Sequence, residues 1–510
     1  MNDASAATLQ TLGSKAASSS RVSSWLVPTV VLLSIASLIT IERNISPAVP
    51  INVDPAYYAV VSHELLNGER LYTDIWDHKP PAPFIVYGAA ELLFGYGPAT
   101  LLTLNLILTL LMLVLLFLVG RRGPGGDISG YIAAATWAIV SGSIGLEGRD
   151  PNTEIMMNVC LTGAFLMFVN SKDGMTRSGA IVGGLLFLIA TMFKPVVVAA
   201  ALLICLANLM FARDRNEAVR STAIISGIGV IGWAATFGYF AWTGRAAIFA
   251  DSMVAFNRSY SGSIVGNLIA PLTGDAELLI DVIGPIAVIA AGLFVLVIWF
   301  DRRLAALVAA FVAAGWFGIA APGRFSVHYY QLWLPPLIIA SAWGIGVLMN
   351  SEKRLVRWAS PVVIGLLFGG LIATQISEYK TVIAGEHTPV VKKLAHSAPT
   401  LRFIRENLEP NETFFLWGIT TNMYLLAERR PPAAVIFDGH LENGPMFATL
   451  SSRVISDLNR ERPELLVVEH GRPPVPSWIS DGYDTKPIFD DPNGYAVYAR
   501  RDGRLGHERR

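Results

Sequence analysis

Residues 98–120 read PATLLTLNLILTLLMLVLLFLVG, a run without a charged side chain. A helix needs about 20 such residues to cross a bilayer core of about 30 Å. Similar runs recur along the chain, so the sequence predicts eleven membrane spans. They are expected near 25–41, 98–120, 130–146, 154–170, 179–193, 195–212, 220–241, 278–300, 304–320, 327–349 and 358–376. The separation of 179–193 from 195–212 rests on Phe193-Lys194-Pro195 alone.

The composition supports a membrane protein. Of the 510 residues, 53% are hydrophobic and 15% are charged, and the mean hydropathy is +0.49. A soluble domain carries roughly 25% charged residues, and a disordered chain has low hydrophobicity. Lys+Arg equals Asp+Glu at 39 each, so no basic surplus points to a nucleic acid. Cys160 and Cys205 lie in apolar runs and are expected to be small buried hydrophobes.

The distribution of Lys and Arg predicts the orientation of the spans. With the N-terminus inside, every inner loop holds at least two basic residues, whereas the first outer loop (42–97) holds 3 basic and 7 acidic residues. This is the bias expected of cytoplasmic loops. An odd number of spans then places the C-terminal region outside. The predicted location is the cytoplasmic (inner) membrane of a bacterium.

The chain divides into three predicted parts. Residues 1–24 are expected to form a flexible cytoplasmic tail, and 25–376 a membrane domain that includes the first outer loop. Residues 377–510 show strand patterns at 413–417, 465–468 and 495–498, with helical periodicity at 446–460. The predicted fold class is therefore an α-helical polytopic membrane protein with a small C-terminal α/β domain outside the cytoplasm.

The first outer loop concentrates the groups that carry chemistry. Asp54 is predicted to cap a helix with Pro55 at its first position, and that helix is expected to lie along the membrane surface through Tyr57 and its neighbours. A second short amphipathic helix is expected to start after Pro83 and to run to about Phe94. Between them lies Asp74-Ile75-Trp76-Asp77-His78-Lys79, which as a bare sequence is also compatible with a solvated turn.

Two further outer segments carry charge at a membrane boundary. One contains Arg149, Asp150 and, at the start of the next span, Glu154. The other begins at Arg324 and continues through His328-Tyr329-Tyr330. Charges at such places are costly unless they are paired or face a cavity. Interfacial anchoring is the plain alternative for both segments. One helical turn would separate Arg324 from His328, so the two could bind an anionic headgroup such as phosphate.

Several activities are disfavoured by missing motifs. The sequence has no Walker A loop, no dinucleotide fingerprint, no G-x-S-x-G and no H-E-x-x-H. A transporter or flippase for a lipid-linked sugar remains an alternative, but it would need polar or broken helices near mid-membrane. A non-catalytic scaffold of a cell-envelope complex is a third interpretation.

The combination of these segments resembles a known family. An early Asp54, the block Tyr72-Thr73-Asp74-Ile75-Trp76-Asp77-His78-Lys79-Pro80-Pro81, a late His328-Tyr329-Tyr330 with Leu334-Pro335-Pro336, and an outer C-terminal domain occur together. This pattern is similar to bacterial GT-C glycosyltransferases related to dolichyl-phosphate-mannose protein mannosyltransferases and lipid A aminoarabinose transferase. The resemblance covers roughly residues 25–350.

The resemblance implies transfer of a sugar from a polyprenyl-phosphate donor to an acceptor on the outer face. Asp54 matches the catalytic acid of the family's first loop, and Lys79 matches its phosphate-contacting lysine. The loop with Arg149 and Asp150 lines the same cavity in the family. The remaining candidates are Asp150 as a second catalytic group; Arg324, Arg258 and His328 for the donor phosphate; and Tyr57, Tyr58, His78, Arg149, Glu154 and Tyr329 for the substrate cavity.

The chemistry expected from these residues is a direct displacement that inverts the anomeric carbon. Asp54 would take the proton of the acceptor hydroxyl, and Lys79 would stabilise the leaving phosphate. A divalent cation is compatible with this scheme, but no ligand set compels it, and no soluble cofactor is needed. Protein mannosyltransferases carry Asp-Glu where this chain has Asp54-Pro55. This difference favours a lipid or glycan acceptor over a protein acceptor.

Overall fold

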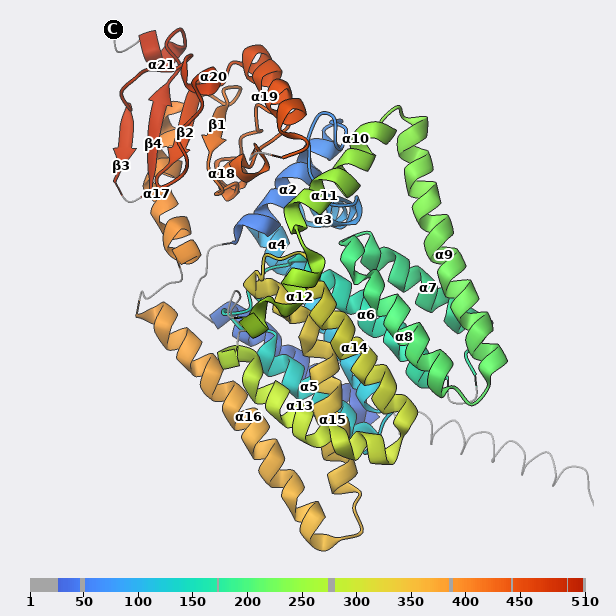
Figure 1. Cartoon of the computed structure of the whole chain (residues 1–510). Helices are drawn as coiled ribbons and strands as arrows, with labels where there is room; N and C mark the ends of the chain where they lie inside the picture. Colours follow the sequence, from blue (N-terminus) through green and yellow to red (C-terminus); the bar gives the residue numbers. More distant parts are fainter. Residues whose placement is uncertain are drawn as a thin grey trace, which may run out of the picture.

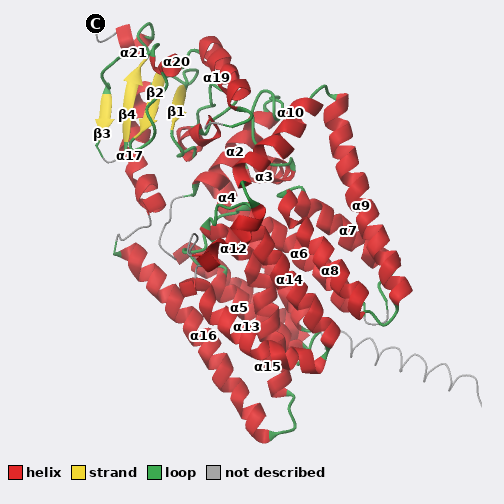
Figure 2. Ribbon diagram, viewed as in Figure 1, coloured by secondary structure: helices red, strands yellow, loops and turns green. Residues whose placement is uncertain are grey.

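The chain folds into a helical bundle that carries a small sheet at one end (Figures 1 and 2). The computed structural model describes residues 26–45, 51–171, 174–273, 280–384, 389–441, 444–492 and 494–507. The predicted cytoplasmic tail at 1–24 lies outside these residues. The fold class predicted from the sequence, helical membrane protein with a small α/β region, is confirmed.

Eight helical segments of the described chain are long and apolar enough to cross a membrane. They are Leu26–Ile45, α4 (Pro98–Gly120), α6 (Thr153–Asn170), α9 (Arg215–Trp242), Ile283–Phe300 within α13 (Ile280–Phe300), α14 (Arg302–Ala320), Val327–Met349 and α16 (Arg354–Ile383). Val327–Met349 combines the 3₁₀ helix η3 (Val327–Trp333) with α15 (Leu334–Met349).

Three predicted spans correspond to shorter apolar helices. These are α5 (Asp127–Val140), α7 (Arg177–Thr191) and Pro195–Phe211, which joins η1 (Pro195–Val197) to α8 (Val198–Phe211). All eleven predicted spans therefore fall on helices, and the number that crosses the membrane stays a prediction. The span expected at 130–146 ends early, because the chain turns after Val140.

Burial separates central helices from peripheral ones. In both α6 and Val327–Met349, 83% of the most apolar window is buried, against 11% in α9 and 17% in α16. Apolar side chains on the peripheral helices remain uncovered, and Trp242 and Trp299 are each 85% exposed. Exposed apolar surface of this kind is what a lipid environment covers, and Trp is enriched at membrane interfaces.

The first outer loop forms two buried helices, α2 (Val53–Leu66) and α3 (Ala82–Phe94). Two details differ from the prediction. Asn52, not Asp54, caps α2, because its side chain accepts a hydrogen bond from the Val53 N–H; Asp54 lies in the first turn. The helix is covered on all sides rather than on one face, since every residue from Pro55 to Ser62 is buried and α2 packs between α3 and α18 (Asn422–Ala427); its position along a membrane surface stays a prediction.

The C-terminal region contains a four-stranded sheet in the order β1-β2-β4-β3. Its strands are β1 (Phe414–Trp417), β2 (Leu465–Glu469), β3 (Phe489–Asp491) and β4 (Tyr495–Ala499). β1 and β2 are parallel, with Phe415 opposite Leu466, and α19 (Phe447–Glu461) lies in the connection between them. The three predicted strands and the predicted helix are confirmed. Strand β3 escaped prediction because it is short and only partly buried. The helices α17 (Pro389–Asn407), α20 (Ser477–Ser480) and α21 (Arg504–His507) complete this region.

The segment after α9 is more structured than a short outer loop. It contains α10 (Ala246–Ala250), the π-helix η2 (Asp251–Phe256), α11 (Asn257–Ser261) and α12 (Ile264–Thr273). The Trp76 indole N–H donates to the Ser252 hydroxyl at 2.9 Å, and the Asn257 amide donates to the His78 carbonyl at 2.9 Å. The segment is thereby fixed against the first outer loop.

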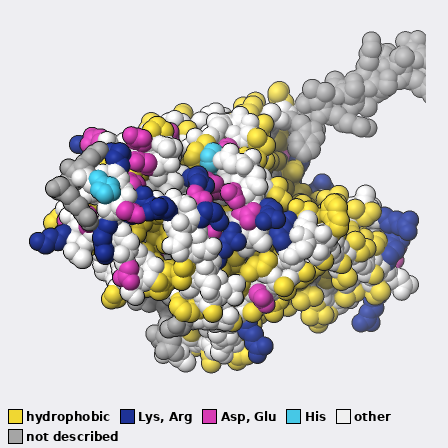
Figure 3. All heavy atoms as spheres, turned by 90° about the horizontal axis from the view of Figure 1, so that it is seen from above, with side chains coloured by type: hydrophobic (Ala, Val, Ile, Leu, Met, Phe, Trp, Pro, Cys, Tyr) yellow, Lys and Arg dark blue, Asp and Glu magenta, His cyan; other side chains and the backbone are white. Residues whose placement is uncertain are grey.

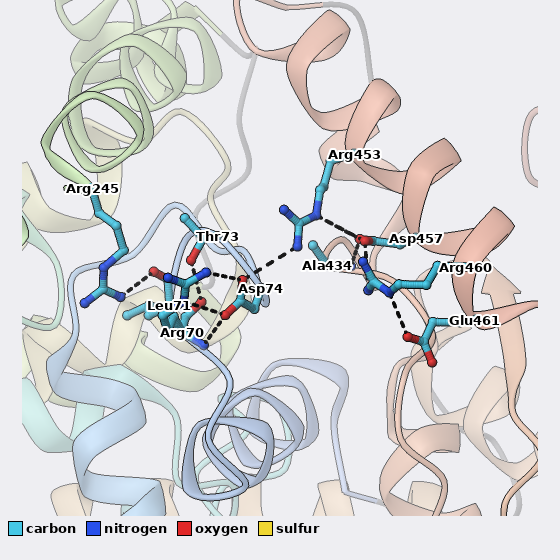
Figure 4. A network of polar contacts seen from close by, with 10 residues as sticks. All are labelled: Arg70, Leu71, Thr73, Asp74, Arg245, Ala434, Arg453, Asp457, Arg460 and Glu461. Carbon is cyan, nitrogen blue, oxygen red and sulfur yellow. Dashed lines mark hydrogen bonds and ion pairs between the residues drawn. The ribbon is translucent and has the colours of Figure 1, made fainter. Parts of the chain in front are cut away.

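The C-terminal region docks on the same loop, so both lie at one end of the bundle (Figure 1). The backbone N–H of Trp76 donates to the Ala434 carbonyl at 2.9 Å, and the backbone N–H of Ala434 donates to the buried Asp457 carboxylate at 2.9 Å. Arg453 joins Asp457 to Asp74, and the network continues to Arg245 (Figure 4). Seen from this end, Lys, Arg, Asp and Glu side chains lie interspersed, with apolar side chains on the flanks (Figure 3).

Asp457 tests this docking. Asp457→Ala leaves the buried Ala434 N–H without an acceptor, which costs about 1–3 kcal/mol, so we expect a lower Tm in detergent. Asp457→Asn keeps an acceptor oxygen, so its Tm should lie between those of the wild type and Asp457→Ala. Asp481→Ala removes an exposed carboxylate of the same region and should change the stability by less than about 0.5 kcal/mol. Thermal unfolding is monitored by tryptophan fluorescence. Equal Tm values for Asp457→Ala and Asp481→Ala would contradict the role of Asp457 in this docking.

Candidate functional site

A cavity of about 570 Å³ opens where the first outer loop, the η2–α12 segment and the C-terminal region meet the bundle. This is within the usual range for small-molecule sites. One part of its lining is polar and holds Asp54, Lys79, Lys194, Arg258 and His328. Another part is apolar and includes Val196, Val254, Ile264 and Phe317. The cavity can therefore take a ligand that has both a charged and an apolar portion.

Asp54 faces this cavity from the first turn of α2. Its side chain is 41% exposed because one side meets the cavity. The Tyr58 hydroxyl donates to Oδ2 at 3.3 Å, and His328 Nε2 lies 3.8 Å from the same oxygen. Burial raises the pKa of Asp54, but the charges of Lys79 and His328 outweigh it, so that the pKa lies below its ordinary value. Asp54 is a carboxylate at neutral pH.

Lys79 presents an ammonium to the cavity without a carboxylate within ion-pair distance among the described residues. Its Nζ lies 4.9 Å from the centre of the Tyr58 ring. Burial lowers the pKa of Lys79, but Asp77 and Asp54 raise it further, so the amine stays charged. Asp77 is fully buried and accepts the Lys79 backbone N–H at 2.8 Å. This contact fixes the turn that aims Lys79, so the turn is not simply solvated.

His328 connects Asp54 to a second carboxylate. Its Nδ1 lies 2.9 Å from Glu147 Oε2, which also accepts the Asn152 amide at 3.1 Å. The imidazole is thus held between Glu147 on one side and Asp54 on the other. This arrangement orients His328 and adds positive charge beside Asp54 whenever the ring is protonated.

Lys194 is a site residue that the sequence analysis placed in a loop without a role. It lines the cavity, pairs with Glu154 Oε1 and lies 3.9 Å from the centre of the Tyr329 ring. The break between α7 and α8 positions it, because Lys194 is extended and Pro195 begins η1. The only sequence signal was a Lys-Pro pair between two apolar runs.

Arg258 and Tyr260 reach the cavity from α11, directly after the π-helix η2. Single π-turns occur frequently at functional sites. Arg258 is exposed and forms no ion pair with any described residue. The cavity therefore holds two cations, Lys79 and Arg258, that have no carboxylate partner of their own in the described chain.

Most of the predicted site residues line the cavity, but five do not. Asp54, Tyr57, His78, Lys79, Arg258, His328 and Tyr329 line it; Tyr58, Arg149, Asp150, Glu154 and Arg324 do not. Two of these five contact residues of the lining: Tyr58 donates a hydrogen bond to Asp54, and Glu154 pairs with Lys194.

Arg324 does not share a helix with His328, which corrects the predicted one-turn spacing. Phe325 has φ of 46°, a left-handed conformation that keeps Arg324 outside η3. The Arg324 guanidinium instead lies 3.9 Å from the centre of the Tyr260 ring, at the edge of the cavity.

Arg149 and Asp150 lie beside the start of α2. Arg149 donates to the Arg43 carbonyl at 3.1 Å, and the Asn52 N–H approaches Asp150 Oδ1 at 3.5 Å. Burial, with the nearby charge of Glu147, raises the pKa of Asp150 to about 8. These surroundings favour the protonated acid at neutral pH, and Asp150 lies outside the cavity lining, so its role as a second catalytic group stays a prediction.

The cavity does not offer a ready-made metal site. Within the described ranges, no group of three or more His, Cys, Asp or Glu side chains is placed to hold a metal ion. Asp54 is the one carboxylate in the part of the cavity lining that the structure describes. The thiols Cys160 and Cys205 are buried in the apolar helices α6 and α8, as expected of small hydrophobes.

Solved structures with the same fold include two of ArnT from Cupriavidus metallidurans. The apo form has a TM-score of 0.64 at 13% identity, covering 94% of this chain and 98% of that one. The form bound to undecaprenyl phosphate has a TM-score of 0.60 at 14% identity, with coverages of 92% and 97%.

A third similar structure is the archaeal oligosaccharyltransferase AglB from Archaeoglobus fulgidus, in complex with an inhibitory peptide and a dolichol-phosphate. It has a TM-score of 0.56 at 13% identity, covering 86% of this chain and 69% of that one. No family model and no curated protein sequence matches the chain. The chain has the fold of the GT-C membrane glycosyltransferases, which confirms the resemblance seen in its residues.

Asp150 gives a test of the electrostatics beside the cavity. With a pKa raised from 3.8 to about 8, the folded protein binds the proton more tightly than the unfolded chain. The Asp150 contribution to stability therefore falls as the pH rises from about 4 to about 8. Asp150→Asn removes this contribution, so its Tm should decline less than that of the wild type between pH 5 and pH 8.5. Parallel Tm profiles for the two proteins would show that Asp150 is not perturbed, and Asp251→Asn, an exposed change, serves as the control.

Proposed function

We propose that the protein is a membrane glycosyltransferase that moves a sugar from a polyprenyl-phosphate donor to a hydroxyl of an acceptor. One observation carries the proposal: an ionised carboxylate, Asp54, shares a cavity with two cations, Lys79 and Arg258, that have no carboxylate partner among the described residues. A base and an anion site side by side are what a displacement at a sugar phosphate requires.

The two parts of the cavity fit the two parts of such a donor. The phosphate would bind Lys79 and Arg258, with His328 close by. The polyprenyl chain would leave along the apolar lining formed by Val196, Val254, Ile264 and Phe317. The fold supports this class of ligand, because the similar ArnT structure is bound to undecaprenyl phosphate and the AglB structure contains a dolichol-phosphate.

The reaction would proceed as a single displacement. The acceptor oxygen attacks the anomeric carbon from the side opposite the phosphate, and its proton passes to the Asp54 carboxylate. The bond between the anomeric carbon and the phosphate oxygen breaks, and its electron pair remains on the phosphate. Lys79 stabilises this growing charge, and the configuration at the anomeric carbon is inverted.

The acceptor is proposed to be a lipid or a glycan. Pro55 follows Asp54 where protein mannosyltransferases carry a second acid, so the first loop lacks the feature that accompanies a protein acceptor in that family. We further propose that the cavity opens on the outer face of the cytoplasmic membrane of a bacterium, with the N-terminus inside. The excess of Lys and Arg in the inner loops supports this orientation.

Asp54→Asn tests the base. The amide keeps the size of the side chain but cannot accept the proton, so the transfer rate should fall by about 10²–10⁴-fold. The assay follows release of undecaprenyl phosphate from sugar-linked undecaprenyl phosphates by purified protein in liposomes that contain bacterial envelope lipids. Asp251→Asn, an exposed change at η2, should retain the wild-type rate. A wild-type rate in Asp54→Asn at equal protein level would exclude Asp54 as the base.

Lys79→Ala tests the phosphate site. Loss of an unpaired cation from a partly desolvated site should weaken binding of undecaprenyl phosphate by at least about tenfold, and it should also slow transfer. Lys486→Ala removes an exposed lysine of the C-terminal region and provides the matched control. If Lys79→Ala binds undecaprenyl phosphate as tightly as the wild type and the control Lys486→Ala do, Lys79 is not part of a phosphate site.

A further inference from the structure

Six aromatic and imidazole rings gather beside the phosphate site, and His440 stands at their centre. Its ring centre lies 4.8 Å from that of Phe437, 5.1 Å from Trp76 and 5.3 Å from His78. Tyr57 and Phe256 follow at 5.8 and 5.9 Å. All five neighbours meet His440 at steep angles, between 74° and 87°. Tyr57, His78, Phe437 and His440 line the cavity, and we call these four residues the ring wall.

The C-terminal region contributes half of the ring wall. Phe437 and His440 belong to residues 431–441, which are anchored at two points. Ala434 is bonded to Trp76 and Asp457, as described above. Asp438 accepts two hydrogen bonds from the Arg472 guanidinium, both at 2.7 Å. This doubly anchored segment closes the cavity over the first outer loop, so the cavity is incomplete without the C-terminal region.

The ring wall offers hydrogen bonds without charge. His440 is 93% buried, and its Nδ1 has no hydrogen-bond partner among the described residues. Burial and the charge of Lys79 lower the pKa of His440 to about 3, so the imidazole is neutral. A neutral imidazole carries one donor and one acceptor, which matches a hydroxyl group. Aromatic faces beside it supply apolar contact area for the C–H surface of a ring.

The charge of the lining argues against an amine on that ligand. Among the described residues that line the cavity, Asp54 is the one carboxylate, against the cations Lys79, Lys194 and Arg258. The pKa of His78 is also lowered, by burial first and then by Lys79, His440 and other cations. A place where burial, together with nearby cations, disfavours charged imidazoles also disfavours an ammonium group.

Resting on the proposed function, we propose that the ring wall of Tyr57, His78, Phe437 and His440 is the subsite for the donor sugar and that this sugar is an uncharged ring. Position assigns it to the donor rather than to the acceptor. His78 precedes Lys79 directly in the chain, and a sugar esterified to a phosphate on Lys79 must lie beside that phosphate.

The test compares three probes by calorimetric titration of the full chain in detergent. They are undecaprenyl phosphate, undecaprenyl phosphate carrying mannose, and undecaprenyl phosphate carrying 4-amino-4-deoxyarabinose. For the wild type, we expect the mannose probe to bind at least about tenfold more tightly than the amino-sugar probe, because an unpaired ammonium is costly to desolvate.

Two variants isolate the ring wall. Phe437→Leu, at a half-buried position, and His440→Phe, which keeps a ring but loses the hydrogen bonds, should each raise the Kd of the mannose probe by about fivefold or more. Both should leave the Kd of undecaprenyl phosphate within about twofold, whereas Lys79→Ala weakens both probes. Phe489→Leu, in the C-terminal sheet and outside the cavity, is the matched control and should change neither Kd.

Three results would overturn the inference. Equal weakening of both probes by Phe437→Leu and His440→Phe would make the ring wall a purely structural element. If the same two variants bind the mannose probe as the wild type does but have a raised KM for the acceptor, the ring wall belongs to the acceptor site. Equal or tighter binding of the amino sugar would disprove the preference for an uncharged ring. Failure of the wild type to bind undecaprenyl phosphate at all would contradict the proposed function itself, and the inference with it.

Discussion

A charge that leaves water must be paired or must face a ligand, and this constraint organises the site. Glu154, which is almost fully buried, is held by Lys194, and Glu147 is held by His328 and Asn152. Asp77, fully buried, is held by the backbone of the turn that it shapes. After these pairings, Lys79 and Arg258 keep cationic groups without a carboxylate partner in the described chain. The unpaired charge is concentrated where a phosphate would bind, and a carboxylate, Asp54, stands next to it.

The backbone of Ala434 links the first outer loop to the C-terminal region. Its carbonyl accepts a hydrogen bond from the Trp76 backbone N–H, and its own N–H donates to Asp457, so this one residue joins the first outer loop to α19. Trp76 is also tied to Ser252 in the π-helix η2. Three segments far apart in the sequence are thereby fixed around His78 and Lys79. The C-terminal region is therefore part of the cavity and not an independent appendage.

The sequence predicted what is local and left out what depends on tertiary contacts. Long apolar runs predicted the helices, because the bilayer imposes a length on each span, and alternating residues predicted β1, β2 and β4. The cap of α2 was placed two residues late, because Asn52 and Asp54 both suit a cap and only the backbone decides between them. Asp54, Lys79 and His328 were identified because they stand near distinctive motifs. Lys194 and His440 were missed, since each reaches the cavity only through a fold that joins distant segments. Asp150 sits in a charged loop like the others, but its surroundings favour the protonated acid.

The arrangement also bears on transport, the main alternative to catalysis. A transporter needs a path that can open toward either face of the membrane through the middle of the bundle. Here the central helices α6 and α15 are packed on nearly every side. The charged groups of the site gather instead at the end of the bundle that carries the first outer loop and the C-terminal sheet (Figure 1). Such a site can act on a lipid headgroup at that surface while the lipid tail stays in the bilayer. A cavity closed by the anchored C-terminal region, over a fixed carboxylate and lysine, favours chemistry on the headgroup over its passage across the membrane.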